Sequence, residues 1–264
     1  MKTYTAIAVI VAIAFLWPRP ADPLPGFPHV FLWAWERPEN LEFLDPHATG
    51  IAFLARTVCL RGGAVSVRPR LQPLRYPPGA VLMAVVRVEP RDSIRPPVDA
   101  ASAAIAEAAA IPGVRALQVD FDATLSERPF YRDLLADLRR RLPPSMPLSM
   151  TALTSWCESD GWIAGLPVAE AVPMLFRMGP GERPARTFRP PLCRSSAGVS
   201  VDEPLRQPPS AARLYICLLY TSGIHRKTHL IGGLESRNLN KDRGRRRWRA
   251  GMGRRRPNLP AAVA

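Results

Sequence analysis

The stretch Val114-Arg-Ala-Leu-Gln-Val-Asp-Phe-Asp-Ala-Thr124 predicts a buried strand that ends in two acids. Apolar and polar residues alternate along it, so a strand places one set on each face: Leu117, Val119 and Phe121 on one, and Gln118, Asp120 and Asp122 on the other. Aspartate is depleted from strands, and an unpaired buried charge is costly, so two aspartates at a strand end indicate a function. The alternative is that Asp120 pairs with a nearby arginine and Asp122 caps a turn.

Seven further apolar stretches predict strands, in residues 29–36, 50–56, 80–89, 147–153, 171–177, 197–201 and 213–216. Helices are expected over 98–110 and 127–142, the second capped by Ser126, and a short one through Trp162, with a small hairpin insertion at 65–74. Strands that alternate with helices indicate an α/β fold, here a (β/α)8 TIM-like barrel. We expect the barrel to be lean or incomplete at its C-terminal end, because no clear helix follows the last strand.

The positive charge of the chain is concentrated at its C-terminal end. Residues 223–264 carry twelve Lys or Arg and two acids, which leaves only +4 of the net charge of +14 for the rest. One coding of Ile216-Cys-Leu-Leu-Tyr-Thr-Ser222 contains a transposase mosaic end, and apolar periodicity is absent beyond it. We therefore expect residues 217–264 to be a non-native or disordered basic tail. Its possible metal pair, His225 and His229, and its arginine cluster are discounted, so no physiological nucleic-acid partner is expected.

The N-terminal segment predicts export. Lys2 precedes an apolar run from Ala6 to Trp17, which is short for a spanning helix and suits the core of a signal peptide. A good small-x-small cleavage site is missing before residue 22, so an uncleaved anchor and a buried first helix are alternatives. We expect residues 1–28 to be a signal peptide or membrane anchor plus a proline-rich linker, and 29–216 to be the barrel. The protein would be exported, either periplasmic or anchored in the inner membrane, with membrane contact only through this segment.

The chain has four cysteines, at positions 59, 157, 193 and 217. Cys157 and Cys193 both fall in predicted loops after strands, and outside the cytoplasm a disulfide between them is plausible on position alone. The close spacing typical of a zinc site is absent. Neither a metal nor a cofactor is expected.

Charged and aromatic side chains follow several predicted strands. In a parallel barrel the C-terminal ends of the strands form one rim, which carries the active site. Candidate catalytic residues there are Glu36, Glu89, Asp120 and Asp122, and candidate substrate-binding residues are Trp33, Trp35, Trp156, Arg177, Asp202 and Glu203. The alternatives are core packing for each tryptophan and an ion pair with Asp120 or Asp122 for Arg177.

Several ordered motifs together resemble one bacterial family, catalogued as domain of unknown function 3142. They are Trp33-Ala-Trp-Glu-Arg-Pro-Glu39, Gln118-Val-Asp-Phe-Asp-Ala123, Ser149-Met-Thr-Ala-Leu153 with Ser155-Trp-Cys157, Pro173-Met-Leu-Phe-Arg-Met-Gly179 and Gly198-Val-Ser-Val-Asp-Glu-Pro204. The resemblance covers about residues 29–216. It implies a glycoside-hydrolase-like barrel without an established activity.

A more distant likeness is to family 18 chitinases, in which alternating acids on the fourth strand end in a catalytic glutamate. Asp120 and Asp122 match the alternation, but Thr124 stands where the glutamate is expected, and Glu127 lies in the first turn beyond. Glycoside hydrolysis needs one protonated and one ionised carboxyl group, and crowded acids provide both. We expect an exported glycoside hydrolase that acts on a polysaccharide or glycan. The alternative, favoured by Thr124, is a non-catalytic envelope protein that binds a glycan or a protein partner.

Overall fold

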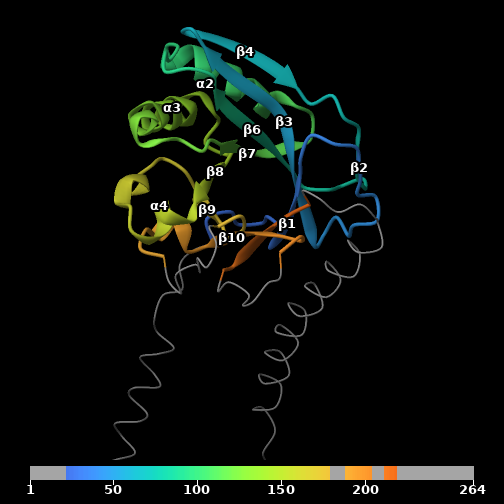
Figure 1. The fold of residues 1–264 in the computed structure, drawn as a ribbon. Helices are drawn as coiled ribbons and strands as arrows, with labels where there is room; N and C mark the ends of the chain where they lie inside the picture. Colours follow the sequence, from blue (N-terminus) through green and yellow to red (C-terminus); the bar gives the residue numbers. More distant parts are fainter. Residues whose placement is uncertain (1–21, 179–187, 204–210, 219–264) are drawn as a thin grey trace, which may run out of the picture. The chain divides into compact units, whose positions relative to one another are not determined.

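The chain forms a closed ring of eight parallel strands in a computed structural model that describes residues 22–178, 188–203 and 211–218 (Figure 1). The ring strands are β1 (Val30–Ala34), β3 (Thr49–Arg61), β6 (Leu82–Pro90), β7 (Val114–Asp120), β8 (Leu148–Leu153), β9 (Glu170–Met174), β10 (Ser196–Ser200) and β11 (Arg213–Cys217). They follow one another around the ring in chain order, and β1 closes it by pairing with both β3 and β11. The predicted TIM-like barrel is therefore confirmed, and its C-terminal end is complete as a ring of strands.

Helices cover only part of the ring. Figure 1 shows α2 (Val98–Ala106), α3 (Arg128–Arg141) and α4 (Thr154–Glu158) along one side, where they connect β6 to β9. Between β1 and β6 the described connections carry short strands instead: β2 (Glu39–Asn40), β4 (Ala64–Pro69) and β5 (Leu74–Arg75). β4 pairs antiparallel with the second half of β3 outside the ring, so the hairpin spans residues 56–69 and not, as predicted, 65–74, because β3 continues to Arg61. The barrel is lean because few of the connections that the structure describes are α-helical.

The apolar and polar residues that alternate along β7 lie on opposite faces of the strand, as predicted. Leu117, Val119 and Phe121 are buried on the outside of the barrel, where the Phe121 ring lies 4.9 Å from that of Tyr131 on α3. The polar set faces inward, because the side chain of Gln118 bonds to groups of β1 and β8. The two faces of this strand thus separate packing under a helix from contacts inside the ring.

Large aromatic side chains fill the middle of the barrel. The Trp33 ring stacks on Tyr215 with centroids 5.1 Å apart, and Tyr215 stacks on Phe31 at 5.3 Å. Two glycines make the room, since a Cβ atom at Gly198 would lie 2.6 Å from the Trp33 ring and one at Gly50 would lie 2.4 Å from that of Phe31. The interior therefore combines a few large rings with aliphatic side chains such as Met83, Val85 and Val172.

Hydrogen bonds connect the interior across the strands. The Trp33 indole donates to Gln118 Oε1 at 2.8 Å, the Gln118 amide donates to Ser149 Oγ at 3.0 Å, and Ser149 donates to Glu170 at 3.2 Å. Glu170 is fully buried near the start of β9, where Arg213 Nη1 lies 3.5 Å from its carboxylate. This network lies toward the N-terminal ends of the strands, the barrel end that is usually associated with stability.

Both ends of the chain extend beyond the described residues. The apolar run from Ala6 to Trp17, and with it the predicted signal peptide or anchor, lies outside them, as do His225, His229 and the rest of the basic tail from residue 219 on. At the C-terminal boundary β11 runs to Cys217, one residue past the predicted strand, and Leu218 is also buried. Among the described helices, none is long and apolar enough to cross a membrane.

Candidate active site at the barrel rim

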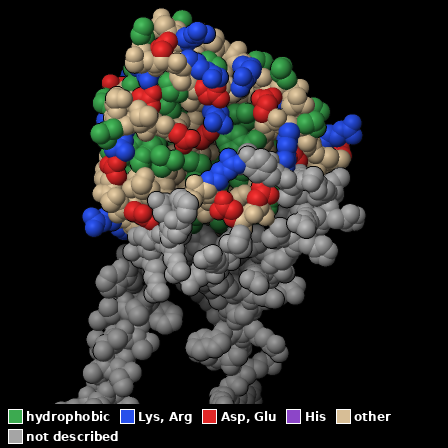
Figure 2. All heavy atoms as spheres, viewed as in Figure 1, with side chains coloured by type: hydrophobic (Ala, Val, Ile, Leu, Met, Phe, Trp, Pro, Cys, Tyr) green, Lys and Arg blue, Asp and Glu red, His purple; other side chains and the backbone are tan. Residues whose placement is uncertain are grey.

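A pocket of about 370 Å³ opens where β6 and β7 end. Its charged lining residues are Arg68, Arg87, Glu89, Arg91, Asp120 and Asp122. Three of the four predicted catalytic acids, Glu89, Asp120 and Asp122, therefore share one cavity at the C-terminal rim. The pocket is mixed in charge, and Figure 2 likewise shows basic and acidic side chains next to one another on the face in view.

Asp120 is the buried acid of the pocket. It is the last residue of β7, 7% exposed, and its Oδ1 accepts a 2.8 Å hydrogen bond from the Thr151 hydroxyl on β8. Burial, followed by the neighbouring charge of Asp122, raises the pKa of Asp120 to about 6, although the Thr151 hydrogen bond and Arg87 act in the opposite direction. Asp120 can therefore hold or release a proton near neutral pH.

Asp122 is the exposed acid of the pocket. It follows β7 by two residues, in phase with Asp120, so both side chains face the mouth of the barrel. Partial burial raises its pKa, and the positive charge of Arg87 lowers it. The two carboxyl groups thus differ in environment, which is the condition for one to carry a proton while the other is ionised.

Glu89 is held by arginines. Its carboxylate forms an ion pair with Arg91 and lies 3.4 Å from Nε of Arg87. It lines the same pocket as the aspartates, but its charge is neutralised by these partners. It is therefore better placed to position Arg87 than to exchange protons.

Glu36 does not join this group. It is exposed after β1, and its Oε1 accepts a 3.0 Å hydrogen bond from the backbone N–H of Leu71, in the connection that follows β4. It is not among the residues that line the pocket. The prediction that Glu36 assists at the site is corrected, because a position after a barrel strand does not by itself bring a side chain to this side of the rim.

Two of the three predicted sugar-stacking tryptophans belong to the core. Trp33 is 1% exposed inside the barrel, and Trp156 is 2% exposed on α4, edge-on to Trp162 with centroids 4.9 Å apart. Their ring faces are covered by protein, so the prediction of substrate contact is corrected for both. Trp35 is half-buried just beyond β1, and its indole N–H points to Cys217 Sγ at 3.1 Å.

Arg177, Asp202 and Glu203 lie together in the connections after β9 and β10. All three are exposed, and Glu203 Oε1 accepts a 2.8 Å hydrogen bond from the backbone N–H of Arg177, whose φ is 53°. They are on the predicted rim, but they do not line the pocket with the aspartates. The arginine that opposes the pKa rise of both aspartates is Arg87.

Thr124 and Glu127 are structural residues in this fold. They form a capping box that starts the turn before α3: the Glu127 carboxylate accepts from the Thr124 backbone N–H at 2.7 Å and from its hydroxyl at 2.8 Å. Arg95 forms an ion pair with the same carboxylate. The predicted cap at Ser126 is therefore wrong, because the turn begins two residues earlier, and Glu127 is not free to act as an acid.

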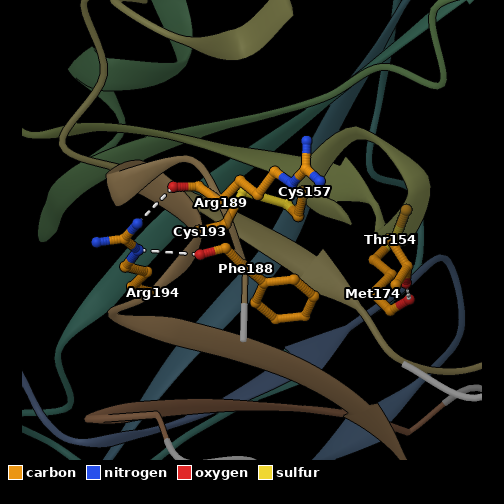
Figure 3. Close-up of a disulfide and its surroundings, with 7 residues drawn as sticks. All are labelled: Thr154, Cys157, Met174, Phe188, Arg189, Cys193 and Arg194. Carbon is orange, nitrogen blue, oxygen red and sulfur yellow. Dashed lines mark hydrogen bonds between the residues drawn. A yellow bond between two sulfur atoms is a disulfide. The ribbon is translucent and has the colours of Figure 1, made fainter. Parts of the chain in front are cut away.

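A disulfide links the connections on the helical side. Cys157 on α4 and Cys193 in the 3-10 turn Pro191–Cys193 are bonded, and Figure 3 shows Arg189 and Arg194 around them. The Arg189 backbone N–H donates to the Cys157 carbonyl at 3.0 Å, and Arg194 Nε donates to the Phe188 carbonyl at 3.0 Å. The disulfide thus holds the segment after β9 against the helix after β8. Cys59 and Cys217 are not part of a disulfide, and Cys217 Sγ accepts the hydrogen bond from Trp35.

Four charged or hydrogen-bonding residues of the site were not predicted: Arg68, Arg87, Arg91 and Thr151. Arg87 carried a signal, because it is the one charge within the apolar run Leu82–Val88 and is in phase with Glu89. Thr151 alternates with Met150 and Ala152 in the same way as the polar set of β7. Arg68 had no such signal, since its place depends on how the hairpin folds over β3. In the described part of the chain, His, Cys, Asp and Glu side chains form no cluster suited to a metal ion.

Comparison with known proteins supports part of the expected resemblance. The model of a domain of unknown function (DUF3142) matches residues 82–172, the stretch from β6 into β9, so the resemblance is confirmed there. No curated protein matches the chain. Among solved structures, the spore cortex-lytic enzyme SleL of Bacillus cereus is similar, with 16% identity and a TM-score of 0.42 over 67% of this chain and 52% of that enzyme. The chain thus spans about half the length of SleL.

Proposed function

We propose that this chain is a carbohydrate-active barrel that hydrolyses glycosidic bonds through Asp120 and Asp122. The observation that carries the proposal is that the two carboxyl groups share one rim pocket in unlike environments, one buried beside Thr151 and one exposed beside Arg87. Glycoside hydrolysis uses this kind of pair.

The two aspartates take different roles. Asp120, with a pKa of about 6, carries the proton and donates it to the oxygen of the leaving sugar. Asp122 is ionised and attacks the sugar or activates a water molecule. Glu89 keeps Arg87 beside both groups. The positive charge of Arg87 favours the ionised form of both, so it is the deeper burial of Asp120 that leaves the proton there while Asp122 is ionised.

Replacement of Asp122 by asparagine tests the reaction. We expect Asp122→Asn to fold normally and to release reducing ends from cell-wall or exopolysaccharide fragments about 10²- to 10⁴-fold more slowly than the unaltered chain, because the ionised carboxylate is lost. Asp133→Asn, the same change at an exposed position on α3, is the matched control and should keep full activity. Unchanged turnover by Asp122→Asn would show that this acid has no part in hydrolysis.

A second function, glycan binding without turnover, is favoured by one observation. Thr124 occupies the place of the catalytic glutamate in chitinases, and Glu127 is tied to Thr124 and Arg95. Saccharide binding measured by calorimetry, with no reducing ends released by any fragment, would support this function over hydrolysis.

We also propose that the protein is exported, to the periplasm or an inner-membrane anchor. The apolar run Ala6 to Trp17 and the disulfide between Cys157 and Cys193 support this, since disulfides persist in oxidising compartments. Alkylation of the chain as recovered from cells is the test. Fully reactive thiols at both positions would contradict export.

A further inference from the structure

One wall of the pocket is built by strands that continue beyond the ring. β3 is 13 residues long, and β1 pairs with it only as far as Phe53. From Arg56 onward the neighbour of β3 on that side is β4 instead, while β6 follows β3 on the other side to Pro90 (Figure 1). The result is a three-stranded extension of the sheet beside the barrel mouth.

The register of these strands aligns two arginines with the acid pair. Thr57 on β3 is paired with Arg68 on β4 and with Arg87 on β6, and Arg87 is paired with Asp120 on β7. Paired residues on neighbouring strands project to the same face of a sheet. The four side chains therefore form one row that leads from Asp120 away from the barrel axis.

The outer arginine of this row has no acidic partner. Arg68 is exposed, and no described Asp or Glu forms an ion pair with it; its nearest polar contact is a marginal one of 3.5 Å from Nη2 to Thr57 Oγ1. Glu89, one of the carboxylates of the lining, is already paired with Arg87 and Arg91. A positive group at the edge of the pocket is thus available to a ligand.

The pocket lacks an aromatic face. Phe121 is the aromatic residue in its lining, and that side chain is 1% exposed, packed on Tyr131. Contact with a ligand must therefore come from charge and hydrogen bonds rather than from stacking. A guanidinium group suits a carboxylate, to which it donates two parallel hydrogen bonds.

We propose that Arg68, with Arg87 two strands away in the same pocket lining, forms a subsite for a carboxylate on a sugar, so that the chain takes acidic, uronic-acid-containing glycans. Three strand spacings separate Arg68 from Asp120, about 14 Å between Cα atoms. The charged sugar on Arg68 is therefore not the one at the bond beside Asp120 but another unit of the same chain. As a statement about the substrate, this inference rests on the proposed function. Binding of an acidic sugar at Arg68 does not require turnover.

Binding of matched oligosaccharides to the full chain tests the subsite. The probes are oligogalacturonate, oligoglucuronate and oligomannuronate, each compared by calorimetry with its carboxyl-reduced, neutral form. We expect at least one acidic form to bind about tenfold more tightly than its neutral form, and Arg68→Gln to remove this difference. Arg75→Gln, at an exposed arginine outside the pocket lining, is the matched control and should leave the preference intact.

The outcomes separate the subsite from the reaction. If an acidic oligosaccharide binds only when Arg68 is present and is not cleaved, the result supports the subsite and contradicts the proposed hydrolysis. If the chain cleaves a neutral glycan, if this cleavage depends on Asp122, and if acidic forms are not preferred, the result overturns the subsite and supports the hydrolysis. Equal binding of acidic and neutral forms, no binding of any acidic form, or full binding by Arg68→Gln also overturns the subsite.

Discussion

At the scale of single residues, the burial of Asp120 suits the proposed reaction but lowers the stability of the folded chain. Desolvation is the main reason for its raised pKa, followed by the charge of Asp122, and the Thr151 hydrogen bond offsets only part of the rise. The folded chain therefore holds a proton on Asp120 at a pH at which the unfolded chain, with an aspartate pKa of about 3.9, has lost it. Ionisation of Asp120 costs folding free energy.

The sign of this effect predicts a pH-dependent stabilisation by Asp120→Asn. Below about pH 4 the carboxyl group is protonated in both states, so the substitution should have little effect. As pH rises from about 4 to about 6, from the unfolded to the folded pKa, the unaltered chain loses on the order of 3 kcal/mol, after which the loss levels off; the variant does not lose it. Urea unfolding should therefore show the variant to be more stable by about 2–3 kcal/mol at pH 8.

Asp133→Asn is the control for this measurement, because Asp133 is exposed on α3 and its substitution should change stability by the same small amount at both pH values. A stabilisation by Asp120→Asn that is equal at pH 4 and pH 8 would mean that Asp120 does not titrate between them.

At the scale of elements, the disulfide joins α4 to the 3-10 turn Pro191–Cys193. Cys157 and Cys193 are both buried, and they close a loop with a sequence separation of 36. That loop contains β9, one of the ring strands with only five residues. The cross-link therefore limits the freedom of β9 and its connections in the unfolded chain.

Removal of the disulfide should lower stability without changing the fold. We expect the double variant Cys157→Ala, Cys193→Ala to lose about 3–4 kcal/mol of unfolding free energy, mainly because the unfolded chain gains loop entropy. Chemical denaturation of the oxidised chain, of the same chain in reductant and of the variant is the measurement. Cys59→Ala, at a free cysteine, is the control. A variant as stable as the oxidised chain would exclude a stabilising role for the bond.

At the scale of the whole molecule, closure of the barrel is secured by a buried charge pair. Arg213 begins β11, and its side chain bonds to the carbonyls of Pro28 and Leu24 at 3.1 and 3.0 Å and to Asp22 at 3.1 Å. Its Nη1 faces Glu170, which accepts hydrogen bonds from serines of β8 and β10 and from Tyr215. The last strand, the segment before the first strand and β9 are thus joined inside the ring.

Loss of one partner of this pair should destabilise the molecule strongly. Glu170→Gln leaves the Arg213 charge buried without its counter-ion there, and we expect a loss of about 3–5 kcal/mol in urea unfolding. Glu107→Gln is a suitable control, because Glu107 forms an exposed ion pair with Arg56 and should contribute at most about 1 kcal/mol. Equal effects of the two substitutions would show that the buried pair does not secure the barrel.

Much of the fold followed from local patterns. All eight ring strands were predicted within a few residues, and the inward and outward faces of β7 were assigned correctly, because a period of two depends only on neighbours in the chain. The cap of α3 was misplaced for a local reason as well: Thr124, Ser126 and Glu127 are all capping residues, and the choice among them depended on the turn before the helix.

The site could be predicted only in part. The sequence by itself determined that Asp120 and Asp122 end a strand on its polar face. It also placed Glu89 on the same rim, where the structure has it in their pocket. The tertiary structure alone decided that Arg87 and Arg68 line that pocket, that Glu36 does not, and that Trp33 fills the barrel. The reason is that register, ring closure and the fold of the hairpin over β3 pair residues far apart in the chain, and the energy of those pairings is not encoded in any one segment.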